Sequence, residues 1–510
     1  MVAFSTLLDG AVSRVRKSIY GDSIKARSAR AVMALGVGTV TGGGMKFVRS
    51  MVLARILAPD QIGIMAIVMS FSIAFDALAE VGVKQSVIQN KEGANTDYLN
   101  VAWWIQVARG LCLFGIAFLL APWISSFYDN PELLSLLRVA FLAIVLRAFV
   151  SPRAYVLEKE YKFGQAVFII QGSAILGAIT TVGLALVIRN VWALVVGFVI
   201  EMAIMCILSF IFVPFLPRFR IDRKSLVELM KFARGMFGLP VLTMISFQAP
   251  NLVLGKVIPK DQLGQLGFYS YASLLAYIPI DLYARIISPV LLPAFSEVQD
   301  DKSALCRGLL QTTRWTAFFV VPLIALMVCC ASELLLVAYG PQYVVMAIPF
   351  TFLCLQILAR NEASILAGMY LAIAQPHLQR RFAIIRAMAI IGLIYPAAVR
   401  FGPLGVAVVI AVSHFVVLLM QVFKSREIIG LKLSHYVRSF VPGILVALPL
   451  IATVGLLRLF KVSSPILVLS IGISVFIATF LASAVFLCLP KKLLTVTKKS
   501  KDKLVSTKLT

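Results

Sequence analysis

The sequence has few charged residues, and acids are the scarcer kind. Only 14% of the 510 residues are charged, and 48 lysines and arginines face 23 aspartates and glutamates, which gives a formal net charge of +25. A soluble domain is about a quarter charged. This chain is 60% hydrophobic, and its mean hydropathy is +0.94. The composition excludes an ordinary soluble protein, and with it the nucleic-acid binding that such a basic chain would otherwise suggest.

The residue types that carry most enzyme chemistry are also scarce or scattered. The three histidines (His377, His414 and His435) lie far apart, and the seven cysteines form no C-x-x-C pair, so we expect neither a metal site nor a disulfide framework. Gly36–Lys46 (GVGTVTGGGMK) fits no phosphate-binding pattern. Nucleophile-elbow and zinc motifs are absent too. We therefore predict a protein that is not an enzyme, holds no cofactor and hydrolyses no nucleotide by itself.

Long apolar runs dominate the chain instead. They recur from residue 30 to residue 489, and each is long enough to cross a hydrocarbon core of about 30 Å as a helix. The sequence therefore predicts an all-α polytopic membrane protein with about fourteen spans. The predicted spans are 31–55, 63–88, 99–122, 133–155, 165–188, 191–213, 232–256, 265–293, 315–338, 345–373, 382–400, 403–423, 438–458 and 465–489.

The distribution of cations predicts the orientation. If the N-terminus is cytoplasmic, most lysines and arginines fall in inner loops and tails, including Arg218, Arg220, Arg223 and Lys224. This is the positive-inside pattern. We expect a bacterial inner-membrane protein with both termini in the cytoplasm and a lysine-rich tail at 490–510. Residues 1–30 carry no secretory cleavage signal; a basic amphipathic helix on the membrane surface and a disordered basic tail are both open.

One segment occurs twice. Val52–Gly63 reads VLARILAPDQIG, and Val253–Gly264 reads VLGKVIPKDQLG. The copies close predicted spans one and seven, so an even number of spans separates them and both end on the same face, the outer one. This predicts two parallel-repeat lobes of six helices each. The expected divisions are an N-lobe at 31–213, a linker at 214–231, a C-lobe at 232–423 and two extra spans within 424–489.

Charged residues lie inside the predicted spans. A charge at the bilayer centre costs at least about 2.5–3.5 kcal/mol, so it needs a partner, water or a function. The candidate cations are Lys46, Arg49, Arg109, Arg147, Arg285 and Arg360, and the acids are Asp76, Glu80, Glu201, Asp281 and Glu362. Two interpretations are open. The groups form internal ion pairs, such as Glu80–Lys84 and Asp281–Arg285 at i,i+4, or the cations line a water-filled cavity that binds a phosphate-bearing substrate.

The acids have a second potential role, because carboxylates in such a cavity can carry a proton or a sodium ion as the coupling ion. The glycines between Gly36 and Gly44 in the first span allow either helix mobility or close helix packing.

Two segments resemble a known family. They are Leu53–Gln89 (LARILAPDQIGIMAIVMSFSIAFDALAEVGVKQSVIQ) and Gly267–Asp301 (GFYSYASLLAYIPIDLYARIISPVLLPAFSEVQDD). They are similar to the polysaccharide transporter family, the Wzx-like lipid-linked oligosaccharide flippases of the multidrug/oligosaccharidyl-lipid/polysaccharide exporter superfamily. The resemblance covers roughly residues 30–490. It implies a flippase for undecaprenyl-diphosphate-linked oligosaccharide that supplies O-antigen, capsule or exopolysaccharide, with membrane lipids, a glycan polymerase and other assembly proteins as partners.

Three rival functions stay open. A cation-coupled drug or metabolite antiporter of the same superfamily would need twelve spans and a cavity dominated by acids. A flippase for the peptidoglycan precursor would also have fourteen spans and a cationic cavity. A scaffold protein of a glycan-assembly complex would transport nothing.

Overall fold

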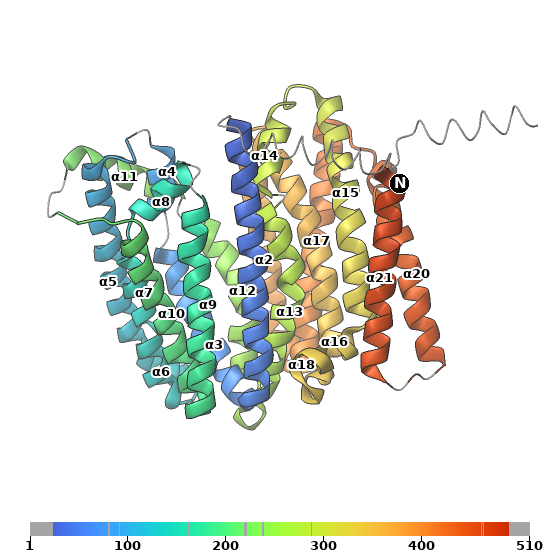
Figure 1. Cartoon of the computed structure of the whole chain (residues 1–510), viewed down its shortest axis with the longest axis horizontal. Coiled ribbons are helices and arrows are strands. Elements are labelled where there is room, and N and C mark those ends of the chain that lie inside the picture. The colour runs from blue at the N-terminus through green and yellow to red at the C-terminus, as the bar shows by residue number, and fades with distance from the viewer. Residues whose placement is uncertain are drawn as a thin grey trace, which may run out of the picture.

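The computed structural model describes residues 24–488 except 80–81, 91, 161–162, 219–221, 237–238, 287, 461 and 463. Every regular element in this part of the chain is a helix. The basic segment at the start of the chain, up to residue 23, and the lysine-rich tail lie outside the described residues. Figure 1 shows two bundles of roughly parallel helices side by side, with α2 running between them.

The first bundle is formed by the helices from α3 to α10. They are α3 (Pro59–Ala79), α4 (Val83–Gln89), α5 (Thr96–Phe127), α6 (Glu132–Ala140), α7 (Leu142–Ala148), α8 (Arg153–Lys159), α9 (Phe163–Ile188) and α10 (Val191–Phe212). Helix α2 (Ile24–Ile56) packs mainly against α9 and also against α13 of the second bundle. The linker contains α11 (Arg223–Met236), which contacts α4 and α5.

The second bundle and two further helices complete the described chain. The bundle comprises α12 (Leu239–Val257), η1 (Lys260–Gln262), α13 (Gly264–Ile286), α14 (Ser288–Ser296), α15 (Lys302–Cys329), α16 (Ala331–Tyr339), η2 (Pro341–Met346), α17 (Ala347–Ala372) and α18 (Pro376–Ile429). It is followed by α19 (Leu433–Arg438), α20 (Val441–Leu459) and α21 (Pro465–Cys488). In Figure 1, α20 and α21 stand at the right-hand edge, where they contact α15 and α16.

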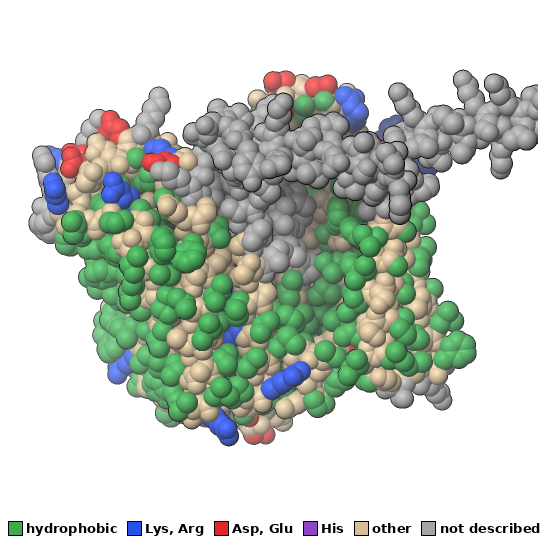
Figure 2. Space-filling view, viewed as in Figure 1, with side chains coloured by type: hydrophobic (Ala, Val, Ile, Leu, Met, Phe, Trp, Pro, Cys, Tyr) green, Lys and Arg blue, Asp and Glu red, His purple; other side chains and the backbone are tan. Residues whose placement is uncertain are grey.

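The protein is a multi-pass membrane protein. Among the described residues, nine helices are long and apolar enough to cross a membrane, or ten when the bent pair from α6 to α8 counts as one span. Helix α18 counts once although Gly402, with φ 56°, separates two helices within it. Figure 2 shows a broad hydrophobic band around the middle of the molecule, with charged side chains gathered mostly at its two ends. The predicted all-α class is confirmed, and fourteen spans are consistent with this helix order.

Several predicted spans are interrupted, and this changes where their charges lie. The sequence suggested one helix at 63–88 with Asp76 and Lys84 on one face. The structure ends α3 at Ala79 and starts α4 at Val83 after Gly82, whose φ of 89° is left-handed. Glycine adopts that conformation without a Cβ clash. Asp76 and Lys84 therefore belong to two helices and take different partners.

Helix ends are set by local hydrogen bonds. A turn at Arg189–Asn190 separates α9 from α10, and the Asn190 side chain accepts a hydrogen bond from the Trp192 backbone N–H at 2.9 Å. Asp301 caps α15 in the same way, accepting from the backbone N–H groups of Ser303 at 2.8 Å and Ala304 at 3.0 Å. Hydrogen bonds from the Ala304 and Ser303 N–H groups lower the pKa of the Asp301 carboxyl, because they stabilise its charged form.

The two copies of the repeated segment touch each other. A Cβ atom on Gly63 would lie 2.4 Å from the backbone oxygen of Leu263, and one on Gly267 would lie 2.2 Å from the backbone oxygen of Pro59. Glycine is therefore required at both positions for α3 and α13 to come this close. The expectation that both copies end on the same face is confirmed by these contacts.

The hydrophobic cores show that the lobes are joined mainly at this end. One cluster contains Ile64 and Ile67 of the first lobe together with Leu254, Leu263 and Leu266 of the second. Toward the other end each lobe has a cluster of its own. Those clusters are centred on Leu99 and Trp103 in the N-lobe, and on Leu366 and Tyr370 in the C-lobe.

The close contact at the repeat predicts a large effect of one methyl group. We expect Gly63→Ala to lower the midpoint of thermal unfolding in detergent, since overpacking against a backbone oxygen costs typically 1–3 kcal/mol. Gly183→Ala in α9 is the matched control, because a Cβ there meets nothing within 4 Å and alanine is the better helix former. Equal midpoints for the two variants would contradict the contact.

Candidate functional site

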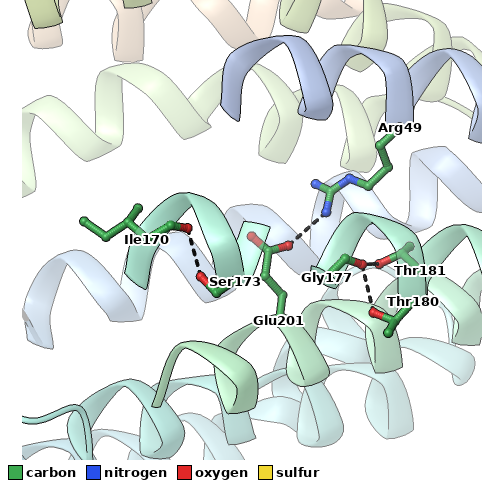
Figure 3. Close-up of polar contacts among 7 residues, drawn as sticks. All are labelled: Arg49, Ile170, Ser173, Gly177, Thr180, Thr181 and Glu201. Atoms are coloured by element: carbon green, nitrogen blue, oxygen red, sulfur yellow. Dashed lines mark hydrogen bonds and ion pairs between the residues drawn. The ribbon is translucent and has the colours of Figure 1, made fainter. Parts of the chain in front are cut away.

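An ion pair links the first helix to the N-lobe. The Arg49 Nη1 atom of α2 lies 2.9 Å from Oε2 of Glu201 on α10. Figure 3 shows the two side chains pointing toward each other past α9. Both are largely buried, with side-chain exposures of 26% and 12%. Removal of either partner would leave a poorly solvated charge, which costs far more than the loss of a surface pair.

Glycine positions the acid of this pair. A Cβ on Gly177 of α9 would lie 2.5 Å from the Cβ of Glu201, so only glycine lets α9 and α10 pack this closely. The hydroxyls of Thr180 and Thr181 both donate to the Gly177 carbonyl, at 3.0 and 2.6 Å, and are visible beside it in Figure 3. The first span is fitted to α9 similarly, since a Cβ on Gly38 would lie 2.3 Å from a Val167 methyl carbon. Close packing therefore explains this glycine.

A cavity of about 270 Å³ lies between the lobes. Lys46 and Arg49 line it from α2, one helical turn apart. The second lobe contributes Gln248 and Asn251 of α12, and Ser270 and Tyr271 of α13. Two of the predicted cations therefore do face an inter-lobe cavity.

Two further cavities lie beside this one in the N-lobe. Lys46 also lines a cavity of about 290 Å³ together with Lys84, Arg147, Glu158 and Glu201. Lys84 and Arg147 in turn line a small cavity of about 50 Å³ that contains Asp76, Gln106 and Arg109. Shared lining residues therefore show that the three cavities are neighbours, in a row from α2 to α5.

The charges in these cavities form pairs between distant helices. Arg147 of α7 pairs with Asp76 of α3. Lys84 of α4 pairs with Glu158 of α8, with Nζ and Oε1 2.8 Å apart. Five cations and three acids line the three cavities, so a positive excess remains among the described lining residues. The cations are Lys46, Arg49, Lys84, Arg109 and Arg147, and the acids are Asp76, Glu158 and Glu201.

Arg360 lies elsewhere than the sequence suggested. It lines a separate cavity of about 540 Å³ within the C-lobe, formed by α12, α13, α14, α17 and α18. Its guanidinium carbon lies 4.0 Å from the ring centre of Phe247 and 5.7 Å from that of Tyr277. Arg360 is therefore removed from the predicted set of inter-lobe cations. Helix packing directs this face of α17 toward other helices of the C-lobe.

Two residues of this C-lobe cavity escaped the sequence interpretation. Arg386 lies inside the predicted span 382–400 but is absent from the candidate cations, and His414 is one of the scattered histidines, yet both line the cavity. Arg386 follows Phe382 and Ala383 in an apolar stretch, a signal that could have added it to the candidate cations.

Of the remaining candidates, Glu362 lines none of the four cavities described above. Glu362, two residues after Arg360, points elsewhere: its Oε2 accepts a hydrogen bond from the Tyr436 hydroxyl of α19 at 3.3 Å. Glu80 and the side chains of Asp281 and Arg285 lie outside the described part of the structure. The predicted i,i+4 pairs therefore stay predictions, and the partner described for Lys84 is Glu158.

Comparison with known proteins places the chain in a family. Residues 52–348 match the family model described as polysaccharide biosynthesis protein. The chain is 23% identical to an uncharacterized membrane protein in the cps region of Klebsiella pneumoniae, over 92% of this chain and 97% of that one. It is 26% identical to the succinoglycan biosynthesis transport protein ExoT of Rhizobium meliloti, over 59% and 60%.

A solved structure shares the fold. The lipid II flippase MurJ in an inward closed conformation superimposes with a TM-score of 0.73 at 15% identity, covering 89% of this chain and 98% of that one. At this identity the likeness concerns the arrangement of helices. The sequence match, which spans more than half of the chain, carries the assignment: the protein belongs to the polysaccharide biosynthesis protein family of membrane transporters.

Proposed function

We propose that this protein is a flippase that moves an undecaprenyl-diphosphate-linked oligosaccharide from the inner to the outer leaflet of a bacterial inner membrane. The observation that carries the proposal is the set of three neighbouring cavities beside the lobe contact, whose described lining residues include more cations than acids. An antiporter for cationic drugs would need the opposite balance. The family assignment and the transport role in the name of ExoT support the same function.

The cations lower the barrier for the diphosphate. Transfer of such a group through bare hydrocarbon would cost tens of kcal/mol. In the proposed mechanism Lys46 and Arg49, which line the inter-lobe cavity, replace part of the water around the phosphates. The guanidinium of Arg49 presents parallel N–H donors that match phosphate oxygens. The polyprenyl tail stays in the lipid. Because this mechanism leaves the covalent bonds of the substrate unchanged, the chain acts in it as a transporter.

Alternating access follows from the uneven contact between the lobes. In the described conformation the lobes meet at the repeat, and the positive-inside pattern of the sequence predicts that this end is the outer face. Outward opening requires α3 and α13 to separate there while the opposite ends approach. Transfer of two negative charges out of a negative interior gains about 4.6 kcal/mol per 100 mV, from about 2.3 per charge. We propose the membrane potential as a driving force, with a proton or sodium ion on Asp76 or Glu201 as the alternative coupling.

The inter-lobe cation gives the first functional prediction. We expect Arg49→Ala to reduce export roughly 10-fold or more, since hydrogen bonds to charged groups contribute about 1.5–3 kcal/mol. Export is measured in a deletion strain that carries each variant, as surface glycan together with lipid-linked oligosaccharide retained inside. Arg426→Ala is the matched control, because Arg426 is exposed at the end of α18. Wild-type export by Arg49→Ala would exclude the cationic path.

The contact at the repeat gives the second functional prediction. A Cβ on Gly264 would lie 3.0 Å from Oδ1 of Asp60 and 3.7 Å from its Cγ. The double variant Asp60→Cys, Gly264→Cys should therefore form a disulfide in an oxidising compartment. We expect this bond to hold the outer ends together and stop export, and a reductant to restore it. The two single-cysteine variants are the controls, and full export by the oxidised double variant would contradict alternating access at this contact.

A further inference from the structure

The C-lobe cavity contains buried polar atoms without partners. Gln356 and Gln421 are only 1% and 2% exposed, both line the cavity, and the Oε1 atom of each makes no hydrogen bond to the described part of the chain. Buried polar groups nearly always have a partner, and leaving one unpaired is unfavourable. A ligand with hydrogen-bond donors would remove that cost.

The same cavity is cationic. Arg360 and Arg386 line it, and none of the described lining residues is an acid. The Arg386 Nε atom is buried and has no hydrogen-bond partner in the described structure. The Arg360 guanidinium is stacked over Phe247 at 4.0 Å, so it loses less freedom when it binds an anion. The ligand therefore needs negative charge as well as donors.

These two requirements narrow the chemistry. A deprotonated diphosphate supplies acceptors but no donors for the amide oxygens, and the proposed function already places the diphosphate of the substrate at Lys46 and Arg49 in the inter-lobe cavity. The negative charge in the C-lobe cavity must then come from the glycan. A neutral sugar supplies hydroxyl donors but no charge for the two arginines. A sugar acid supplies both, because its hydroxyls can donate to Gln356 and Gln421 while its carboxylate accepts from guanidinium N–H groups. The volume of about 540 Å³ falls within the range of about 300–1,000 Å³ usual for small-ligand sites.

The cavity also lies next to the proposed path. Ser270 and Leu274 of α13 line the inter-lobe cavity, and Tyr277 of the same helix lines the C-lobe cavity. Residues three and four apart lie on one helix face, so the two cavities follow each other along that face. One elongated substrate can therefore reach both.

We propose that the C-lobe cavity is a glycan-recognition subsite that binds a hexuronate residue of the lipid-linked oligosaccharide. The diphosphate of the same substrate is held by the N-lobe cations. This inference rests on the proposed function. It assigns Arg360 and Arg386 to the carboxylate, and Gln356 and Gln421 to the sugar hydroxyls.

Binding to the purified full chain in detergent tests the subsite without transport. The probes are a lipid-free disaccharide that ends in glucuronic acid, the matched disaccharide that ends in glucose, and inorganic diphosphate, each titrated calorimetrically. We expect the acidic disaccharide to bind wild type at least tenfold more tightly than the neutral one. Arg386→Gln should abolish that tenfold difference and leave diphosphate binding unchanged. Arg49→Gln should weaken diphosphate binding and preserve the preference for the acidic sugar.

Three results would overturn the subsite. The first is equal binding of the two disaccharides to wild type. The second is an unchanged preference for the acidic disaccharide in Arg386→Gln. The third is loss of diphosphate binding in Arg386→Gln, which would make the cavity a phosphate site. If Arg386→Gln does not fold, Gln421→Met is measured instead. We expect this variant to bind the acidic and the neutral disaccharide more weakly than wild type, because each sugar loses one hydroxyl contact. Vesicles that contain wild type and a diphosphate-linked glycan separate the two proposals: absence of flipping there, with acidic-sugar binding intact, would reject the flippase function alone.

Discussion

The close approach of two helices at glycines near their first residues is the contact on which the rest of the structure depends. Gly63 and Gly267 let α3 and α13 meet with backbone against backbone, and the common hydrophobic core of the two lobes forms around this point. Toward the opposite end each lobe has a separate core. The cavities lie beside this contact, where the lobes are not packed against each other. The duplicated segment therefore holds the two lobes together.

Charge neutralisation within the membrane is the second constraint. Each described ion pair of the N-lobe cavities joins helices far apart in sequence: Arg49 with Glu201, Arg147 with Asp76, and Lys84 with Glu158. These pairs stabilise the bundle because an unpaired charge at this depth is costly. They also hold the cations at cavity walls, where an anionic substrate can compete for them. Structural and functional interpretations of the same residues are therefore compatible.

The cavities of the two lobes differ in chemistry. The N-lobe offers cations partly balanced by acids. The C-lobe offers arginines together with amide groups and no described acid. Such a division suits a substrate with a diphosphate at one end and sugars at the other. The likeness to MurJ at low identity concerns the helix arrangement, whereas in the proposed function these side chains would select the substrate.

Sequence alone was sufficient for the class, the helical fold, the duplication and the charged residues inside spans, because hydrophobic length and periodicity are local properties that bilayer thickness imposes. The sequence could not give the partner of each charged side chain. Nothing near Arg49 in the chain indicates Glu201, and nothing near Arg360 indicates a cavity with Arg386 and His414. The break at Gly82 places Asp76 and Lys84 on different helices. Which charges meet is decided by helix packing in three dimensions, where glycine at a few positions sets how closely the helices approach.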